Sequence, residues 1–125
     1  LRLESWVRFI EQPSGADLVA LYNGALLLAM PSFYEGFGLP ALEALQCSTP
    51  VVVADRASLP EVVGEAGLFI DPDNPTTIAD ACWRIIHDTA LRARLQEAAR
   101  DQVRGFTWEE TARQTLEVYR RILNR

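Results

Sequence analysis

The chain has 125 residues, 49% of them hydrophobic and 23% charged, which suits one soluble globular domain and excludes a disordered or fibrous protein. Seventeen acidic residues against twelve basic ones give a net charge of −5, which excludes a general nucleic-acid binder. All twelve basic residues are arginines, and only three of them precede residue 84. An anion site in residues 1–83, where the net charge is −8, would therefore have little side-chain positive charge to use.

The cysteine, histidine and hydropathy patterns predict a soluble protein of a reducing compartment. Cys47 and Cys82 lie in apolar surroundings without metal-ligand spacing, so we expect buried free thiols. The one histidine, His87, is too little for a metal site. The longest apolar run, of about seven residues, is far short of the roughly 20 that cross a bilayer, and no charged-then-apolar leader opens the chain. We therefore expect a cytoplasmic protein, with peripheral attachment to the inner face of a membrane as an open alternative.

The chain opens with a predicted strand and a predicted helix. Residues 6–10 form an apolar run that favours a strand. Ser14 and Asp17 have the spacing of a capping box, which opens a helix that reaches about Asn23. Gly24 is expected to end that helix in the left-handed conformation.

Two further strands flank a segment that contains two glycines. Residues 25–30 and 51–54 are continuous apolar runs, typical of strands buried on both faces of a sheet. Residues 31–38 form a loop between them, and Pro40 suits the first turn of a helix that ends near Ser48. This part therefore predicts strand, loop, helix and strand in that order.

The rest of the chain is mostly helical. A short helix is predicted from Ser58, and residues 68–70 form a fourth short strand. The three helices that follow cover residues 75–88, 91–104 and 107–123, with Asn74 capping the first and a capping box of Thr107 and Glu110 opening the last. So much helix exceeds what a four-stranded sheet needs, and we expect part of its surface to pack against something outside this chain.

Alternating strands and helices of this kind indicate an α/β fold with a parallel sheet of about four strands and flanking helices. Ligands of such sheets bind at the carboxyl ends of the strands, where the loop over residues 31–38 and the turn over residues 55–58 both lie. Apolar residues on the C-terminal helices fit packing on the sheet better than pairing with a second copy, and a homodimer stays the alternative. They are Trp83, Ile85, Ile86, Val118, Tyr119 and Ile122.

The segment over residues 31–45 carries the chemistry. Gly36 and Gly38 let backbone amides approach a ligand closely, and the helix that begins near Leu39 offers free amides and the positive end of its dipole to a phosphate. The segment contains no basic residue, so a bound anion would depend first on backbone groups. A glycine-containing strand–loop–helix alone is common to many nucleotide and flavin sites.

Two glutamates, Glu35 and Glu43, are separated by seven residues across this loop and helix. Glu43 has apolar neighbours on both sides, so it is either the polar stripe of its helix or a carboxylate held for hydrogen bonding. Glu35 follows Tyr34 on the loop and could equally be an acid without a task. The residues by themselves leave both pairs of alternatives open.

Taken together, these motifs resemble the C-terminal domain of the group 1 retaining glycosyltransferases (family 4), which have the GT-B fold. The two glutamates match the E-x7-E motif of that family in spacing and context. The resemblance covers nearly the whole chain and also includes Thr49-Pro50-Val51-Val52, the segment from Ser58 to Gly64, the segment from Gly67 to Pro72, and Phe106-Thr107-Trp108. It implies a Rossmann-like sheet that is part of a GT-B C-terminal domain.

The resemblance also implies roles for particular residues. Glu35 would lie at the transferred sugar and act as the catalytic glutamate, and Glu43 would bind the ribose hydroxyls of the donor. Gly36, Phe37, Gly38 and Leu39 would contact the sugar and the diphosphate. The reaction implied is transfer of a sugar from a UDP-, GDP- or ADP-linked donor to a glycan, lipid or small molecule with retention of configuration, and no metal or other cofactor is expected.

The chain departs from the family pattern in several places. The family's sheet has about six strands here, so residues 1–125 would be a single partial nucleotide-sugar-binding domain without its N-terminal acceptor domain. The family's Arg and Lys that neutralise the diphosphate would lie in the missing upstream part. Glu11-Gln12-Pro13 stands where relatives usually have a glycine turn, and Ser48 replaces a common glycine. We therefore expect weak nucleotide-sugar binding and no catalysis by this chain alone.

Two other functions compete with this prediction. The first is a non-catalytic interaction or oligomerisation module that keeps the fold. The second is a phosphorylase or a sugar-nucleotide epimerase on the same fold. A phosphorylase needs a lysine-held cofactor that a lysine-free chain cannot hold, and the epimerases generally lack this glutamate context.

Overall fold

The computed structural model describes residues 3–124, whose centre is a parallel sheet of three strands in the order β1-β2-β3. They are β1 (Leu28–Met30), β2 (Val51–Ala54) and β3 (Gly67–Ile70). Met30 pairs with Val53, and Ala54 with Ile70. Three of the four expected strands are therefore confirmed, and the predicted sheet of about four strands is corrected to three.

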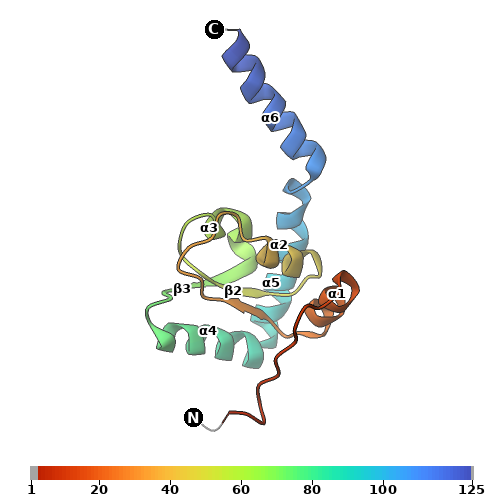
Figure 1. Ribbon diagram of the computed structural model, residues 1–125. Coiled ribbons are helices and arrows are strands. Elements are labelled where there is room, and N and C mark those ends of the chain that lie inside the picture. Colours follow the sequence, from red (N-terminus) through yellow and green to blue (C-terminus); the bar gives the residue numbers. More distant parts are fainter. Residues whose placement is uncertain (1–2, 125) are drawn as a thin grey trace.

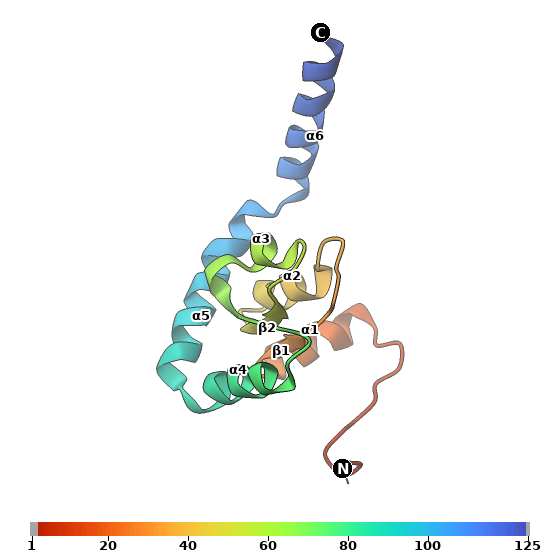
Figure 2. The same cartoon turned by 90° about the vertical axis from the view of Figure 1, so that its left-hand side faces the viewer.

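Helices cover both faces of this sheet and extend beyond it. They are α1 (Gly15–Gly24), α2 (Leu39–Gln46), α3 (Leu59–Val63), α4 (Pro75–His87), α5 (Thr89–Gln102) and α6 (Trp108–Leu123), with short 3-10 turns η1 (Gly64–Ala66) and η2 (Val103–Gly105). α4 lies on one side of the sheet and α2 and α3 on the other (Figures 1 and 2). α5 packs against α2, α4 and η1 and so joins the two helical layers.

The core is built around β2, all four of whose residues are buried. The strand lies in the middle of the sheet with a helical layer on each face, which explains why its sequence is a continuous apolar run rather than an alternating one. The largest fully buried side chains around it are Leu45 of α2, Leu59 of α3 and Ile85 of α4.

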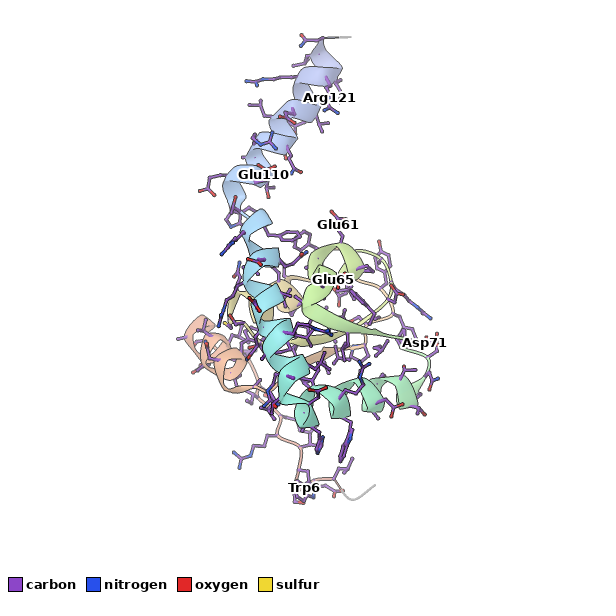
Figure 3. The ribbon with its side chains drawn as sticks, turned by 180° about the vertical axis from the view of Figure 1, so that it is seen from behind. Trp6, Glu61, Glu65, Asp71, Glu110 and Arg121 are labelled. Carbon is purple, nitrogen blue, oxygen red and sulfur yellow. The ribbon has the colours of Figure 1, made fainter. Side chains whose placement is uncertain are left out.

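The segment at residues 6–10 is not a strand, which corrects the first element predicted. It is irregular, with Trp6 84% and Phe9 91% exposed, and Trp6 lies at the far end of the N-terminal segment (Figure 3). An apolar run becomes a strand only where a sheet edge pairs with it, and no strand in the described part of the chain does so. The apolar pattern alone is therefore not sufficient to make these residues a strand.

Helix α1 begins as predicted and ends differently. The hydroxyl of Ser14 accepts a hydrogen bond from the amide of Asp17, and the Asp17 carboxylate accepts one from the amide of Ser14, which completes the capping box. Gly24 is the last helical residue and does not take a left-handed conformation. Instead, the extended residue Ala25 ends the helix and donates its N–H to the carbonyl of Tyr22.

Helix α2 is followed by a residue in the left-handed conformation, Ser48, at the position where the family commonly has a glycine. Ser48 has φ +56°, the Ser48 amide donates to the carbonyl of Leu45, and the Thr49 amide donates to that of Ala44. These two bonds form a Schellman motif, whose left-handed residue is usually glycine. The serine at this position therefore costs backbone strain, as the departure from the family pattern indicated.

Helix α6 extends away from the α/β body (Figures 1 and 2) and has no buried residue. Its capping box is half formed, because Thr107 accepts from the amide of Glu110 while the Glu110 carboxylate pairs with Arg113. Of the apolar residues on the C-terminal helices that were expected to pack on the sheet, only Ile85 is buried. The exposed ones are Trp83, Ile86, Val118, Tyr119 and Ile122. The expectation that helical surface would be left over is thus met, and the preference for packing on the sheet is wrong.

Candidate functional site

The candidate site is the loop at residues 31–38, which connects the carboxyl end of β1 to the start of α2. The residue before the helix, Gly38, is buried and has φ +97°. A Cβ atom built there would lie 2.7 Å from Cδ2 of Leu59, so both the conformation and the space require glycine. Gly36 has a negative φ and no atom within 4 Å of a built Cβ, so nothing in the local packing requires glycine there.

The backbone N–H groups of this loop are free. From Glu35 to Leu39, no backbone amide donates a hydrogen bond to a group in residues 3–124. Within α2, Pro40 has no N–H, and the amides of Ala41 and Leu42 both bond to the carbonyl of Gly38. Five successive donors at the positive end of a helix thus remain available to a ligand that accepts hydrogen bonds.

Glu43 lies on the exposed face of α2, between the buried residues Leu42 and Ala44. Its Oε2 accepts a hydrogen bond of 3.2 Å from the hydroxyl of Tyr22 on α1. Burial, and then this bond to the carboxylate, raise the pKa of Tyr22 above its ordinary value. Both alternatives for Glu43 therefore hold, because it lies on the exposed polar side of its helix and is also held by a hydrogen bond.

Glu35 is half-buried on the loop, ahead of the start of α2, while Glu43 lies one turn inside the helix. In the described part of the chain, the hydrogen bond that Glu43 makes is to Tyr22 and not to Glu35. Both glutamates therefore belong to the loop-and-helix segment that carries the free amides, Glu35 on the loop and Glu43 within α2.

Sequence reasoning overlooked two residues that hold this site. Tyr22 was assigned only to its helix, and Ser58 only to the start of a short helix. The hydroxyl of Ser58 donates to the backbone carbonyls of Glu35 (3.1 Å) and Phe37 (2.8 Å). No sequence signal singled out these roles, because a tyrosine within a helix and a serine directly before a helix are both ordinary.

Arg56, on the turn after β2, does not supply free positive charge to the loop. Its Nη2 lies 2.6 Å from a carboxylate oxygen of Asp73 and 3.3 Å from one of Asp71. Its guanidinium carbon also lies 5.8 Å from the ring centroid of Phe33, a cation–π distance. Arg56 thus connects the segments after the three strands while its charge is compensated by the two acids.

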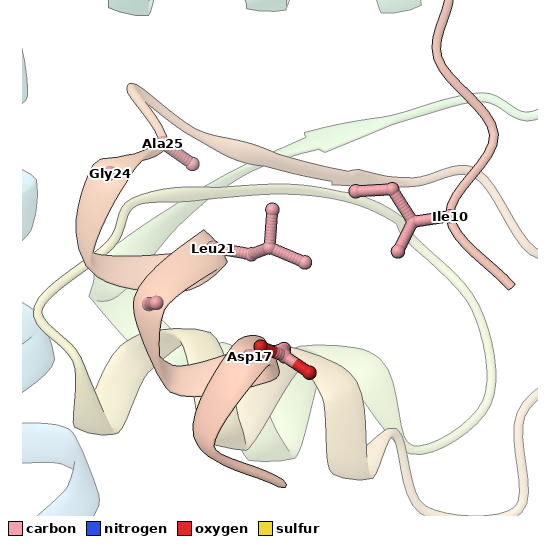
Figure 4. Close-up of a pocket in the computed structure, with 6 residues that line it drawn as sticks. Ile10, Asp17, Leu21, Gly24 and Ala25 are labelled. Atoms are coloured by element: carbon pink, nitrogen blue, oxygen red, sulfur yellow. The ribbon is translucent and has the colours of Figure 1, made fainter. Parts of the chain in front are cut away.

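A hollow elsewhere on the surface does not form part of this site. It has a volume of about 600 Å³ and lies between the N-terminal segment and α1, where Ile10 faces Leu21 (Figure 4). Asp17, Ala20, Gly24 and Ala25 complete its lining. Since Asp17 is engaged in the capping box, this hollow offers few polar groups to a hydroxylated ligand.

Residues 3–124 contain no group of three histidine, cysteine or acidic side chains placed to hold a metal ion. None of the helices described is long and apolar enough to cross a membrane. Cys47 and Cys82 are free and half-buried rather than fully buried, and burial raises the pKa of the Cys82 thiol.

Comparison with known proteins places this site in a family. Residues 1–102, which include the whole candidate site, match the family described as glycosyl transferases group 1. The chain belongs to this family. Among related structures, this group 1 glycosyltransferase chain is similar to the sucrose-phosphate synthase of Thermosynechococcus elongatus, with 34% identity and a TM-score of 0.86 over 98% of the chain and 31% of that protein. The predicted GT-B relationship and α/β fold are therefore confirmed.

Curated relatives support the same family and are named for different activities. The group 1 chain is 40% identical over 117 residues to the O-antigen chain mannosyltransferase B of Escherichia coli, covering 94% of the chain and 31% of the relative. It is 46% identical over 117 residues to the D-inositol 3-phosphate glycosyltransferase of Nocardioides sp., covering 92% of the chain and 26% of the relative. The chain thus spans about a quarter to a third of the length of these relatives.

Proposed function

We propose that this chain forms the donor-binding part of a retaining glycosyltransferase, which transfers a sugar from a nucleotide-diphosphate sugar to an acceptor. The observation that carries the proposal is the row of five free backbone amides from Glu35 to Leu39 at the start of α2. An oxygen-rich anion satisfies these donors without any basic side chain from the loop.

In this proposal, the loop amides, Glu35 and Glu43 each bind a different part of the donor. The amides of Gly36, Phe37, Gly38 and Leu39 bind the diphosphate and the adjoining sugar. Glu35 accepts hydrogen bonds from hydroxyls of the transferred sugar and is the catalytic residue. Glu43 accepts from the ribose hydroxyls, since Tyr22 occupies one of its oxygens and leaves the other free. The donor chemistry needs no metal from this chain.

Full activity is proposed for a longer protein. The acceptor and the side chains that neutralise the diphosphate belong, in this proposal, to parts of the relatives that the chain does not span. The relatives are named for a mannosyl transfer, a transfer involving inositol 3-phosphate and the synthesis of sucrose phosphate. Relatives that share this segment but are named for different activities are compatible with a segment that binds the donor and leaves the choice of acceptor to the rest of the protein.

Binding of the donor tests this function directly. UDP, GDP and ADP and their glucose and mannose conjugates are titrated into the chain, with NMR signals of the loop amides as the readout. We expect weak, about millimolar binding that shifts the amide signals of residues 35–39. The variant Glu43→Gln should bind several-fold more weakly because a neutral amide is a poorer acceptor for the ribose hydroxyls.

The matched control is Glu97→Gln on the exposed face of α5, which removes an equal charge away from the loop and should bind as the unmodified chain does. No binding of any nucleotide would exclude a donor site in this chain. Equal binding by Glu43→Gln would remove Glu43 from the ribose role.

We propose an additional interaction role for the exposed stripe of α6, formed by Trp108, Leu116, Tyr119, Ile122 and Leu123. This role accompanies the donor site, and the partner is another part of the same protein or a second copy of the chain. Sedimentation of the chain over a range of concentrations distinguishes these partners, because only self-association depends on chain concentration.

A further inference from the structure

Ser58 directly precedes α3, where a serine side chain usually caps the helix that follows. It does not cap this helix: no hydrogen bond joins its side chain to an amide of α3. Its hydroxyl instead donates to the carbonyls of Glu35 and Phe37, at 3.1 and 2.8 Å, on a loop more than 20 residues earlier in the chain. One hydroxyl proton is thus shared between two carbonyls that lie on either side of Gly36.

Because peptide units are planar, these two hydrogen bonds also fix the direction of two N–H groups of the loop. In a trans peptide unit, the carbonyl of one residue and the N–H of the next point in opposite directions. A Glu35 carbonyl held toward Ser58 therefore turns the N–H of Gly36 away from Ser58, and the Phe37 carbonyl does the same for the N–H of Gly38. Both amides belong to the free row described above.

The helix behind Ser58 is packed in the core, whereas most of the loop at residues 31–38 is exposed. Leu59, Val62 and Val63 of α3 are buried, and Leu59 packs against Gly38. Gln102 of α5 donates from its side chain to the carbonyl of Val62, which attaches the end of α3 to the next layer. The hydroxyl of Ser58 therefore links a packed helix to two carbonyls of the glycine-containing loop.

We infer that Ser58 is a positioning residue of the donor site, which orients the amides of Gly36 and Gly38 toward the diphosphate of a nucleotide sugar. The inference rests on the proposed function and adds to it the group that arranges the amides before the ligand arrives. Ser58 does not touch the donor and transfers no proton. Its contribution is to prevent the two glycine peptide units from rotating, so that the loop loses less conformational freedom on binding.

The test compares Ser58→Ala with the unmodified chain. Loss of the hydroxyl should weaken the binding of UDP, GDP or ADP about three- to tenfold and lower the melting temperature by only about 3–6 °C, as expected for the loss of two hydrogen bonds. Ser58→Thr keeps the hydroxyl and should retain the affinity. The matched control is Thr77→Val, because the Thr77 hydroxyl likewise donates to two backbone carbonyls, at 3.1 and 2.8 Å, away from the loop. This variant should bind nucleotide as the unmodified chain does.

A second measurement needs no ligand and separates this inference from the proposed function. Backbone order parameters of Gly36 and Gly38 should fall from about 0.85 toward 0.6 in Ser58→Ala, but not in Thr77→Val. If the unmodified chain binds no nucleotide, the proposed function fails, while unchanged order parameters would overturn the role of Ser58 by themselves. Unchanged affinity in Ser58→Ala, or weaker binding that comes with general loss of folded signals, would overturn it as well.

Discussion

The two glycines that precede α2, Gly36 and Gly38, differ in why the position holds a glycine. At Gly38 the backbone has φ +97°, and a Cβ atom would lie 2.7 Å from the buried side chain of Leu59. At Gly36 the backbone is ordinary and the surrounding space is empty. The first glycine is therefore required by the fold, and the second is free to serve the ligand.

Substitution of the two glycines should separate these reasons. Gly38→Ala should lower the free energy of unfolding by about 2–4 kcal/mol, through left-handed strain and the contact with Leu59. Gly36→Ala should change it by less than about 0.5 kcal/mol. Urea denaturation of both variants measures the difference, and equal effects would contradict this division of roles.

Helix α6 is stabilised by ion pairs and hydrogen bonds between its own side chains. Arg113 donates to the Glu110 carboxylate at 2.7 Å and also pairs with Glu117 on the next turn. The bonds from Arg113, and then that from Gln114, lower the pKa of Glu110 from 4.5 to about 2. These charged residues line the polar side of a helix whose other side is apolar and exposed, and Figure 3 shows Glu110 and Arg121 along its length.

The depressed pKa of Glu110 predicts how α6 responds to acid. Because the carboxylate is stabilised in the folded helix, its contribution is fully present above pH 4.5 and is lost as the pH falls through about 2. We expect the NMR titration of the Glu110 carboxyl carbon to have its midpoint near 2, with fraying of the first turn of α6 over the same range. Glu109→Gln is the matched control, and Glu110→Gln should remove the transition. A midpoint near 4.5 would contradict the pairing.

At the scale of the whole molecule, the chain consists of a packed α/β body and a helix that the body does not use. We take Phe106 as the end of the α/β body, because its ring packs edge to face against that of Phe37, with 6.0 Å between the ring centroids. Just before it, Gln102 donates to the carbonyls of Glu61 and Val62. Beyond Phe106, no residue of α6 is buried.

Two truncations should locate this boundary. The chain ending at residue 106 should unfold with a free energy within about 1 kcal/mol of the full chain, because α6 buries nothing against the body. The chain ending at residue 101 loses the bonds of Gln102 and should be less stable by about 1–3 kcal/mol. Thermal unfolding followed by circular dichroism compares them, and a large loss of stability at 106 would show that α6 supports the body.

The sequence alone determined the features that depend on neighbouring residues. The capping box of Ser14 and Asp17, the cap of α4 at Asn74 and the buried run of β2 follow from local hydrogen bonding and from continuous apolar patterns. The loop that offers free amides before α2 was found in the same way, since its glycines and helix start are adjacent in the chain. Family membership followed from these motifs, whereas the roles of the site residues stay predictions.

Only the tertiary structure decided what depends on residues far apart in the chain. The bond from Tyr22 to Glu43, the hold of Ser58 on the loop and the pairing of Arg56 with Asp71 each join residues 13 or more positions apart, and no local pattern encodes such distances. The failed strand at residues 6–10 has the same cause, because a strand forms only where it pairs along a sheet edge, and these residues pair with neither of the edge strands β1 and β3. Local sequence specifies caps and periodicity, while long-range packing selects which side chain holds the site.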